Sequence, residues 1–250
     1  MTDTTCSGVL APDWSLPDGI AAFYTCRQGG SSLAPFDAFN LALHVGDDPM
    51  DVAANRALLP NSDRIAWLNQ VHSARCVPIS QDYFLSLEPA KADASISREK
   101  HLVCAVMTAD CLPILIASKD ASCVAAVHAG WRGLANGVLQ NTLAALPCEP
   151  SNLSIWVGPH ISQSHFQVGQ EVKQALAQYA SAFVKDAEAG KFRCDLFQIV
   201  QAICLHSGIT DITNSDICTY ANHQLFFSHR HAQHHQQQRT GRIVSGIYLR

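Results

Sequence analysis

Two apolar, strand-like segments of this chain each lead to a side chain that can bind a metal ion or act as a nucleophile. Residues 102–107 precede Cys111 in the stretch Thr-Ala-Asp-Cys-Leu-Pro, and residues 123–127 run directly into His128. Short apolar runs bounded by polar residues are typical of buried strands. If these two strands are neighbours, their ends place Cys111 and His128 close together.

His72 is a third candidate, because it follows another short apolar segment, residues 65–68. One thiolate and two imidazoles supplied from separate strand ends would hold Zn²⁺ in a rigid frame and leave its fourth position open. Three protein ligands with one open position are the arrangement of catalytic rather than structural zinc sites. The sequence therefore predicts that His72, Cys111 and His128 are both metal ligands and catalytic residues.

The same three residues are compatible with two other kinds of chemistry. Without a metal, Cys111 could act as the nucleophile of a cytosolic hydrolase, with His128 or His72 as its base. One cysteine and two histidines also occur in blue-copper sites. A multicopper phenol oxidase, however, needs several further paired histidines, and the single His-x-His of the chain is His229-Arg230-His231. A binding module without activity would not need an open metal position.

A glycine-rich turn follows His128 and precedes a helical pattern of apolar residues at 133–146. Such a turn presents free backbone N–H groups to an anion at the start of a helix, and Arg132 can add a bidentate contact. The alternative is a purely structural role, in which Gly130 and Gly133 only permit a tight turn and Arg132 is a surface residue. The proximity of His128 favours a phosphate site formed by Gly130 and Arg132.

Other polar segments supply further candidates. Asn40 and His44 lie in a loop that continues into Gly46, and we expect them to line a substrate pocket. Asp93 is also expected near substrate, and Asp93 or Asp110 would have to transfer protons because no glutamate lies beside the proposed ligands. The His- and Gln-rich segment 229–238 has the composition of a solvated loop without a physiological metal role.

The remaining pattern predicts a layered fold with mixed β-sheets flanked by helices, of the α/β to α+β class, because strands and helices alternate irregularly. No linker rich in Pro, Gly or Ser and no internal repeat divides the chain, so we expect a single domain, residues 1–250. The expected strands are 20–26, 76–79, 154–157 and 243–249, and the expected helices are 51–59, 170–183 and 196–206, the last ending before Gly208.

Composition excludes several classes of function. The formal net charge of −4 over 250 residues gives no electrostatic footprint for nucleic acid or an anionic membrane. No secretory signal and no apolar run of membrane-spanning length is present, so we expect a cytoplasmic protein. Its ten cysteines, including Cys26, are then expected to be thiols. The absence of any Cys-x-x-Cys pair argues against a zinc knuckle or an iron–sulfur cluster.

Several of these segments together identify a resemblance that covers nearly the whole chain. The chain resembles the YfiH-type laccase-domain family, also called multicopper polyphenol oxidase-like. The most specific matching motifs are Thr108-Ala109-Asp110-Cys111-Leu112-Pro113 and His128-Ala129-Gly130-Trp131-Arg132-Gly133, and weaker ones include Arg27-Gln28-Gly29-Gly30, Asn69-Gln70-Val71-His72, Gly158-Pro159-His160-Ile161 and Phe227-Ser228-His229-Arg230. The segment 231–238 is longer than is usual in the family.

The resemblance implies a zinc-dependent purine nucleoside phosphorylase that also has adenosine deaminase activity. By motif, the zinc ligands of the family fall on His72, Cys111 and His128, the same residues that the spacing selects. The expected partners are then adenosine, inosine, guanosine or methylthioadenosine together with phosphate, with copper a weaker candidate than zinc as the metal. Editing of peptidoglycan precursors by a cysteine-dependent amidase, to which the family is also linked, is the alternative activity, and the oligomeric state is left open.

Overall fold

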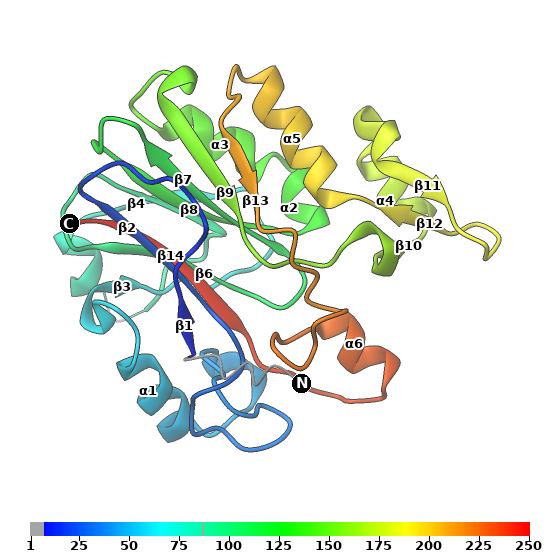
Figure 1. Cartoon of the computed structure of the whole chain (residues 1–250), viewed down its shortest axis with the longest axis horizontal. Coiled ribbons are helices and arrows are strands. Elements are labelled where there is room, and N and C mark those ends of the chain that lie inside the picture. Colours follow the sequence, from blue (N-terminus) through cyan, green and yellow to red (C-terminus); the bar gives the residue numbers. More distant parts are fainter. Residues whose placement is uncertain (1–7, 87) are drawn as a thin grey trace.

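The computed structural model describes residues 8–86 and 88–250 and contains two large sheets that pack face to face (Figure 1). The first sheet has five strands in the order β1-β2-β14-β6-β3. These are β1 Val9–Leu10, β2 Ile20–Thr25, β14 Ile243–Leu249, β6 Val103–Thr108 and β3 Ile65–Ala66. Strand β14 pairs antiparallel with both β2 and β6, so the C-terminal strand lies in the middle of this sheet.

The second sheet has six strands in the order β13-β9-β7-β8-β5-β4. These are β13 Ile212–Asn214, β9 Leu153–Val157, β7 Leu112–Ser118, β8 Val124–Ala129, β5 Ala94–Ser97 and β4 Cys76–Ile79. A small third sheet joins β10 Gln167–Val168, β12 Phe192–Cys194 and β11 Phe183–Lys185. Parallel and antiparallel pairs occur together in the second sheet, which confirms the mixed, layered fold class.

Both faces of the six-stranded sheet are buried, and side chains alternate between them along each strand. In β7, Leu115 and Ala117 face the five-stranded sheet, whereas Ile114 and Ile116 face a helical layer. The helices are α1 Pro49–Ala57, α2 Trp131–Ala135, α3 Val138–Ala145, α4 Gln170–Ala175, α5 Leu196–His206 and α6 His229–His234. Of these, α2, α3 and α5 form the layer that covers the sheet (Figure 1).

Six short 3-10 turns complete the described elements: η1 Leu43–Val45, η2 Ser62–Arg64, η3 Gln81–Leu85, η4 Pro150–Asn152, η5 Gln163–His165 and η6 Ala177–Ala182. Helix α5 has the predicted bounds, and Gly208 follows it with φ +85°, as a glycine past a helix end should. Among the residues described, no helix combines the length and apolar character that a bilayer crossing needs.

Two predicted helices are wrong in extent. Segment 170–183 is helical only in α4, because Leu176 leaves helical geometry, with φ −115° and ψ 27°, and a 3-10 turn follows before strand β11. Segment 133–146 is divided into α2 and α3 by Gly137, which has φ +87°. Apolar periodicity continues across both breaks, since the same core lies beneath them, and so the pattern did not reveal where the backbone turns.

Cys26 corrects the expectation that all the cysteines are thiols, because this residue is disulfide-bonded. The other cysteines within residues 8–86 and 88–250 are free. No spacing motif predicted the bond, because a disulfide depends on the separation of two Cβ atoms in space and not on their separation in sequence.

Candidate active site

Cys111 and His128 meet where the chain crosses from one large sheet to the other. The predicted strand before Cys111 is β6 in the five-stranded sheet, whereas the strand that carries His128 is β8 in the six-stranded sheet, so the two are not neighbours within one sheet. Residues 109–111 make the crossing, and Asp110 has φ +93° there. Strand β7 then pairs antiparallel with β8, with Pro113 opposite His128, and this register brings Cys111 to the histidine.

His72 lies in a loop rather than at a strand end, and Asp93 holds it there. The backbone N–H groups of Val71, His72 and Ser73 donate to the Asp93 carboxylate at 3.2, 2.9 and 2.6 Å, and the Ser73 hydroxyl donates to it at 2.7 Å. His72 has φ +59°, a conformation that non-glycine residues adopt rarely. The dense contacts on one buried carboxylate stabilise this unusual turn.

The same carboxylate orients the second histidine. Asp93 Oδ1 lies 2.8 Å from Nδ1 of His128, so Nε2 of His128 is the ring atom left for a metal. Burial opposes ionisation of Asp93, but hydrogen bonds from His128 and Ser73 lower the pKa of Asp93 to about 2. Asp93 is thus a charged anchor shared by His72 and His128.

The three predicted ligands form one compact group. Cys111 Sγ lies 4.0 Å from Nε2 of His72, and the ligand atoms of His72, Cys111 and His128 all lie within 4.8 Å of one another. Burial opposes ionisation of Cys111, but His128 and His72 outweigh it and lower the pKa of Cys111 to about 6. Burial favours the neutral His128 ring, but the Cys111 charge and Asp93 raise the pKa of His128 to about 9. The pair therefore favours a thiolate, the form that binds metals and attacks carbon.

Gly130 lines the cavity directly beside the ligand group. A Cβ atom at this position would lie 2.8 Å from Cys111 Sγ and 3.2 Å from Cδ2 of His72. Gly130 precedes α2, a helix of only five residues. The absence of a side chain at Gly130 is therefore needed to leave room for the ligand group.

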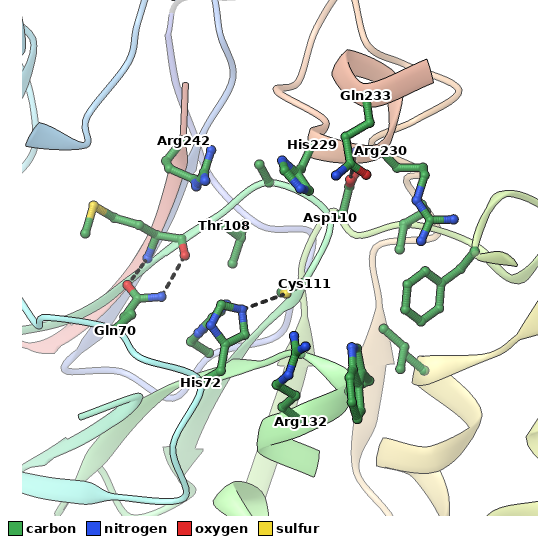
Figure 2. A pocket seen from close by; sticks show the side chains of 18 of the residues that line it. Gln70, His72, Thr108, Asp110, Cys111, Arg132, His229, Arg230, Gln233 and Arg242 are labelled. Atoms are coloured by element: carbon green, nitrogen blue, oxygen red, sulfur yellow. Dashed lines mark hydrogen bonds between the residues drawn. The ribbon is translucent and has the colours of Figure 1, made fainter. Parts of the chain in front are cut away.

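A cavity of about 390 Å³ opens onto the three ligands (Figure 2). This volume lies within the range of small-molecule sites. Part of its wall is apolar or aromatic and consists of Trp131, Ile161, Phe166 and Leu196. The rest is polar and contains three arginines, Arg132, Arg230 and Arg242, together with His44, Gln70, Asp110, His229 and Gln233. The cavity thus offers a stacking surface and a positively charged wall around one candidate metal centre.

The His- and Gln-rich segment is exposed over residues 233–238, as predicted, but its first part is a helix and not a loop. Residues 229–234 form helix α6, whose first turn is capped by the Ser228 hydroxyl accepting from the His231 N–H. Asp110 ties this helix to the ligand loop, because its Oδ2 accepts from the Arg230 N–H at 2.6 Å and its Oδ1 accepts from the Thr219 hydroxyl at 2.6 Å. The conformation follows from these tertiary contacts, which the composition of the segment did not reveal.

The structure separates the remaining predicted site residues into two groups. His44 and Arg132 line the cavity, and the Arg132 guanidinium lies over the Trp131 ring at 4.4 Å. Asn40 and Asp93 are both fully buried, and neither lines the cavity. Asn40 bonds Asp47 and the Arg242 backbone instead. The side chains of Asn40 and Asp93 thus lie behind the cavity wall and support the residues that line it.

Sequence reasoning did not single out several cavity residues, among them Gln70, His229, Arg230, Gln233 and Arg242. Gln70 is fixed by Met107, whose backbone N–H and C=O it bonds at 2.8 Å each. The others come from α6 and from the residue before β14, more than 100 positions after Cys111. Their one signal was the Phe-Ser-His-Arg motif of the resemblance, which includes His229 and Arg230.

Comparison with known proteins extends over almost the full length of the chain. "Purine nucleoside phosphorylase YfiH" of Escherichia coli is 38% identical, covering 97% of this chain and 99% of that protein. "Purine nucleoside phosphorylase PA4543" of Pseudomonas aeruginosa is 39% identical, covering 96% and 98%. The crystal structure of Neisseria meningitidis protein NMB0706 superposes with a TM-score of 0.88 at 38% identity, covering 97% and 99%.

A structure of Bacillus licheniformis YfiH has a TM-score of 0.84 at 27% identity and covers 92% of this chain and 93% of that one. Residues 21–250 match the family model described as multi-copper polyphenol oxidoreductase laccase. The chain therefore belongs to this laccase-like family, in which the curated relatives named above are called purine nucleoside phosphorylases.

Proposed function

We propose that this protein is a zinc-dependent purine nucleoside phosphorylase that cleaves adenosine, inosine, guanosine and methylthioadenosine, and that it also deaminates adenosine. The observation that carries the proposal is the position of the His72–Cys111–His128 group at a cavity that is aromatic on one part of its wall and cationic on another. A purine needs a stacking surface, and phosphate needs cations. The names of the relatives point to the same substrates.

The donor set fits zinc. One thiolate sulfur and two imidazole nitrogens lie close enough to share an ion, and the cavity leaves a further position open to substrate. Bound there, Zn²⁺ supplies Lewis-acid polarisation of an oxygen atom near the nucleoside. Asp93 keeps Nδ1 of His128 occupied, and Gly130 keeps the space above Cys111 clear.

The side chains of the cavity support phosphorolysis as follows. Trp131 and Phe166 provide aromatic faces for the purine, and the guanidinium groups of Arg132 and Arg230 lie over these rings. A phosphate oxygen then forms a bond to C1′ of the ribose while the bond from C1′ to the purine nitrogen breaks. The electron pair of that bond goes to the purine, which takes up a proton and leaves as the free base.

A metal-free thiol hydrolase is the second candidate, and one observation favours it: the lowered pKa of Cys111 beside His128, which is also the arrangement of an activated nucleophile. The structure gives less support to a multicopper oxidase. Such an enzyme needs several groups of metal ligands, and the described residues contain one.

Turnover assays separate these functions. Protein purified without metal supplements is incubated with inosine, with and without phosphate, and ribose 1-phosphate and free base are quantified. We expect base release that depends on both phosphate and bound zinc, and inosine formation from adenosine without phosphate. Activity that persists after zinc removal but is lost on thiol alkylation would instead establish the thiol hydrolase.

A further inference from the structure

A second cavity, of about 350 Å³, shares part of its wall with the first. The shared residues are His44 from η1, His229 and Gln233 from α6, and Arg242 just before β14. Arg239 lines the second cavity but not the first. Four polar side chains from three distant segments thus form a junction at which a ligand can touch both spaces.

Arg242 is held in place in a way that leaves donors available. Its Nη1 donates to the carbonyl oxygens of Thr240 and Gly241 at 3.0 and 2.9 Å, and its backbone N–H donates to Oδ1 of Asn40 at 2.9 Å. Among the described residues, its Nε and Nη2 atoms have no hydrogen-bond partner. A guanidinium fixed on one edge and open on the other is suited to bidentate contact with an oxyanion.

The negative charges that act on Arg242 come from Cys111 and Asp110, and neither side chain is hydrogen-bonded to it. Asp110 is the one acidic residue that lines either cavity within the described chain, and both its carboxylate oxygens already accept hydrogen bonds. Burial, followed by the charge of Arg242, lowers the pKa of His44 and of His229. The protonated form of both imidazoles is therefore disfavoured beside the fixed charge of Arg242, and an arriving anion would make that form more favourable.

Arg132 offers a less suitable place for the same anion. It is exposed at the cavity rim, and its guanidinium lies over the Trp131 ring. In Figure 2, Arg242 and Arg132 lie on opposite sides of His72 and Cys111, so the two arginines contact different ends of a bound substrate. The aromatic side, where Arg132 lies, is the side that the purine would occupy.

We propose that Arg242, at the junction with His44, His229 and Gln233, binds the phosphate dianion that attacks the nucleoside. The assignment rests on the proposed phosphorolysis and fixes the orientation of the substrates: the purine lies against Trp131 and Phe166, and the phosphate lies at the opposite side of the cavity. A free phosphate ion and the 5′-phosphate of a nucleotide share this chemistry, and the junction is assigned to the free ion.

The first test measures binding of inorganic phosphate alone by titration calorimetry. Wild-type protein binds phosphate saturably, Arg242→Gln weakens binding at least about tenfold, and Arg132→Gln changes it by less than about threefold. Arg242→Lys retains the charge without the planar fork and recovers part of the affinity. The reverse ranking of the two Gln variants, or no saturable binding to the wild type, overturns the assignment.

The second test is kinetic and separates the anion site from the proposed function. In phosphorolysis, Arg242→Gln raises the KM for phosphate at least about tenfold, while deamination of adenosine, which uses no phosphate, changes much less. Equal losses in both reactions with a lowered Tm would mean that Arg242 is structural. Loss confined to turnover of nucleoside 5′-phosphates assigns the site to the nucleotide and overturns the proposal. Phosphate binding that depends on Arg242, without ribose 1-phosphate formation, leaves the anion site standing and rejects the proposed function.

Discussion

His72, Cys111 and His128 come from three separate segments of the chain, whereas His231, His234 and His235 lie on or directly beside one short helix. The first group is joined through a carboxylate: Asp93 bonds the His128 ring and the backbone of His72. In the second group, His231 and His235 are stacked, whereas His234 lies edge-on to Tyr220. The His231 ring lies 3.7 Å from that of His223 and 3.9 Å from that of His235.

The two groups show that the number of histidines does not make a metal site. In the first, ring nitrogens and a sulfur converge on one point; in the second, rings face one another, and the described residues contain no second group with metal-binding geometry. Convergence requires a side chain that orients the ligands, as Asp93 does, because a free imidazole would turn to its own best partner. Stacked rings instead hold α6 against the loop that carries His223.

Among the variants that test this comparison, Cys111→Ala should have the largest effect on metal content and turnover. The variant loses the sole sulfur ligand, so we expect it to lose stoichiometric zinc and essentially all turnover together. Metal content is measured by plasma mass spectrometry on protein purified without an affinity tag of histidines. Full zinc occupancy in Cys111→Ala would show that the metal centre has been assigned to the wrong residues.

Replacement of Asp93 by asparagine tests whether orientation, and not only the ligand set, creates the site. The amide cannot accept from all the N–H groups that now bond the carboxylate, so we expect zinc affinity to fall by about 10- to 100-fold with the three ligands still present. Competition with a chelator measures the affinity. Asp195→Asn, which alters the N-cap of helix α5 and not the ligand group, is the matched control and should bind zinc normally. Equal affinity in both variants would contradict the role of Asp93.

The stacked histidines should change how the stability of the protein depends on acid pH. Burial, then the charges of His223 and His235, lowers the pKa of His231. The folded protein therefore binds fewer protons at this site than the unfolded chain, whose histidines titrate near ~6.5. The contribution of His231 to stability is complete above that pH and is lost as the pH falls below it. Between pH 7.5 and 5.5, we expect the Tm of His231→Gln to fall less than the Tm of the wild type. An equal fall in both proteins would show that the stacked rings do not resist protonation.

The smallest effect is expected from replacing His231, His234 and His235 together by glutamine. None of the three lines the main cavity, although His229 and Gln233 of the same helix do. Glutamine also preserves helix propensity. At pH 7.5, kcat and zinc content should therefore match the wild type. A large drop in kcat with the fold intact, judged by circular dichroism, would mean that the stacked rings control the cavity wall.

The local sequence predicted much of the fold and selected the three residues that lie together in the candidate metal site. Helix α5 and strands β4 and β14 have the predicted bounds, and the end of β2 is within one residue. Apolar runs and a helix-ending glycine specify such elements because they depend on the near neighbours in the chain. Cys111 and His128 were recognisable for a similar reason, since each is a reactive side chain placed at the boundary of a buried apolar run.

The tertiary structure alone decided how these elements surround the cavity. Sequence spacing suggested that Cys111 and His128 end adjacent strands, but a crossing between two sheets brings them together. Asp93, expected near the substrate, anchors both histidines, and Arg242 was not among the predicted site residues. These roles depend on contacts between residues 21 to 202 positions apart, which no local periodicity records. A polar side chain shows its role in the sequence only when its partner is near in the chain; these partners become neighbours only after both sheets have formed.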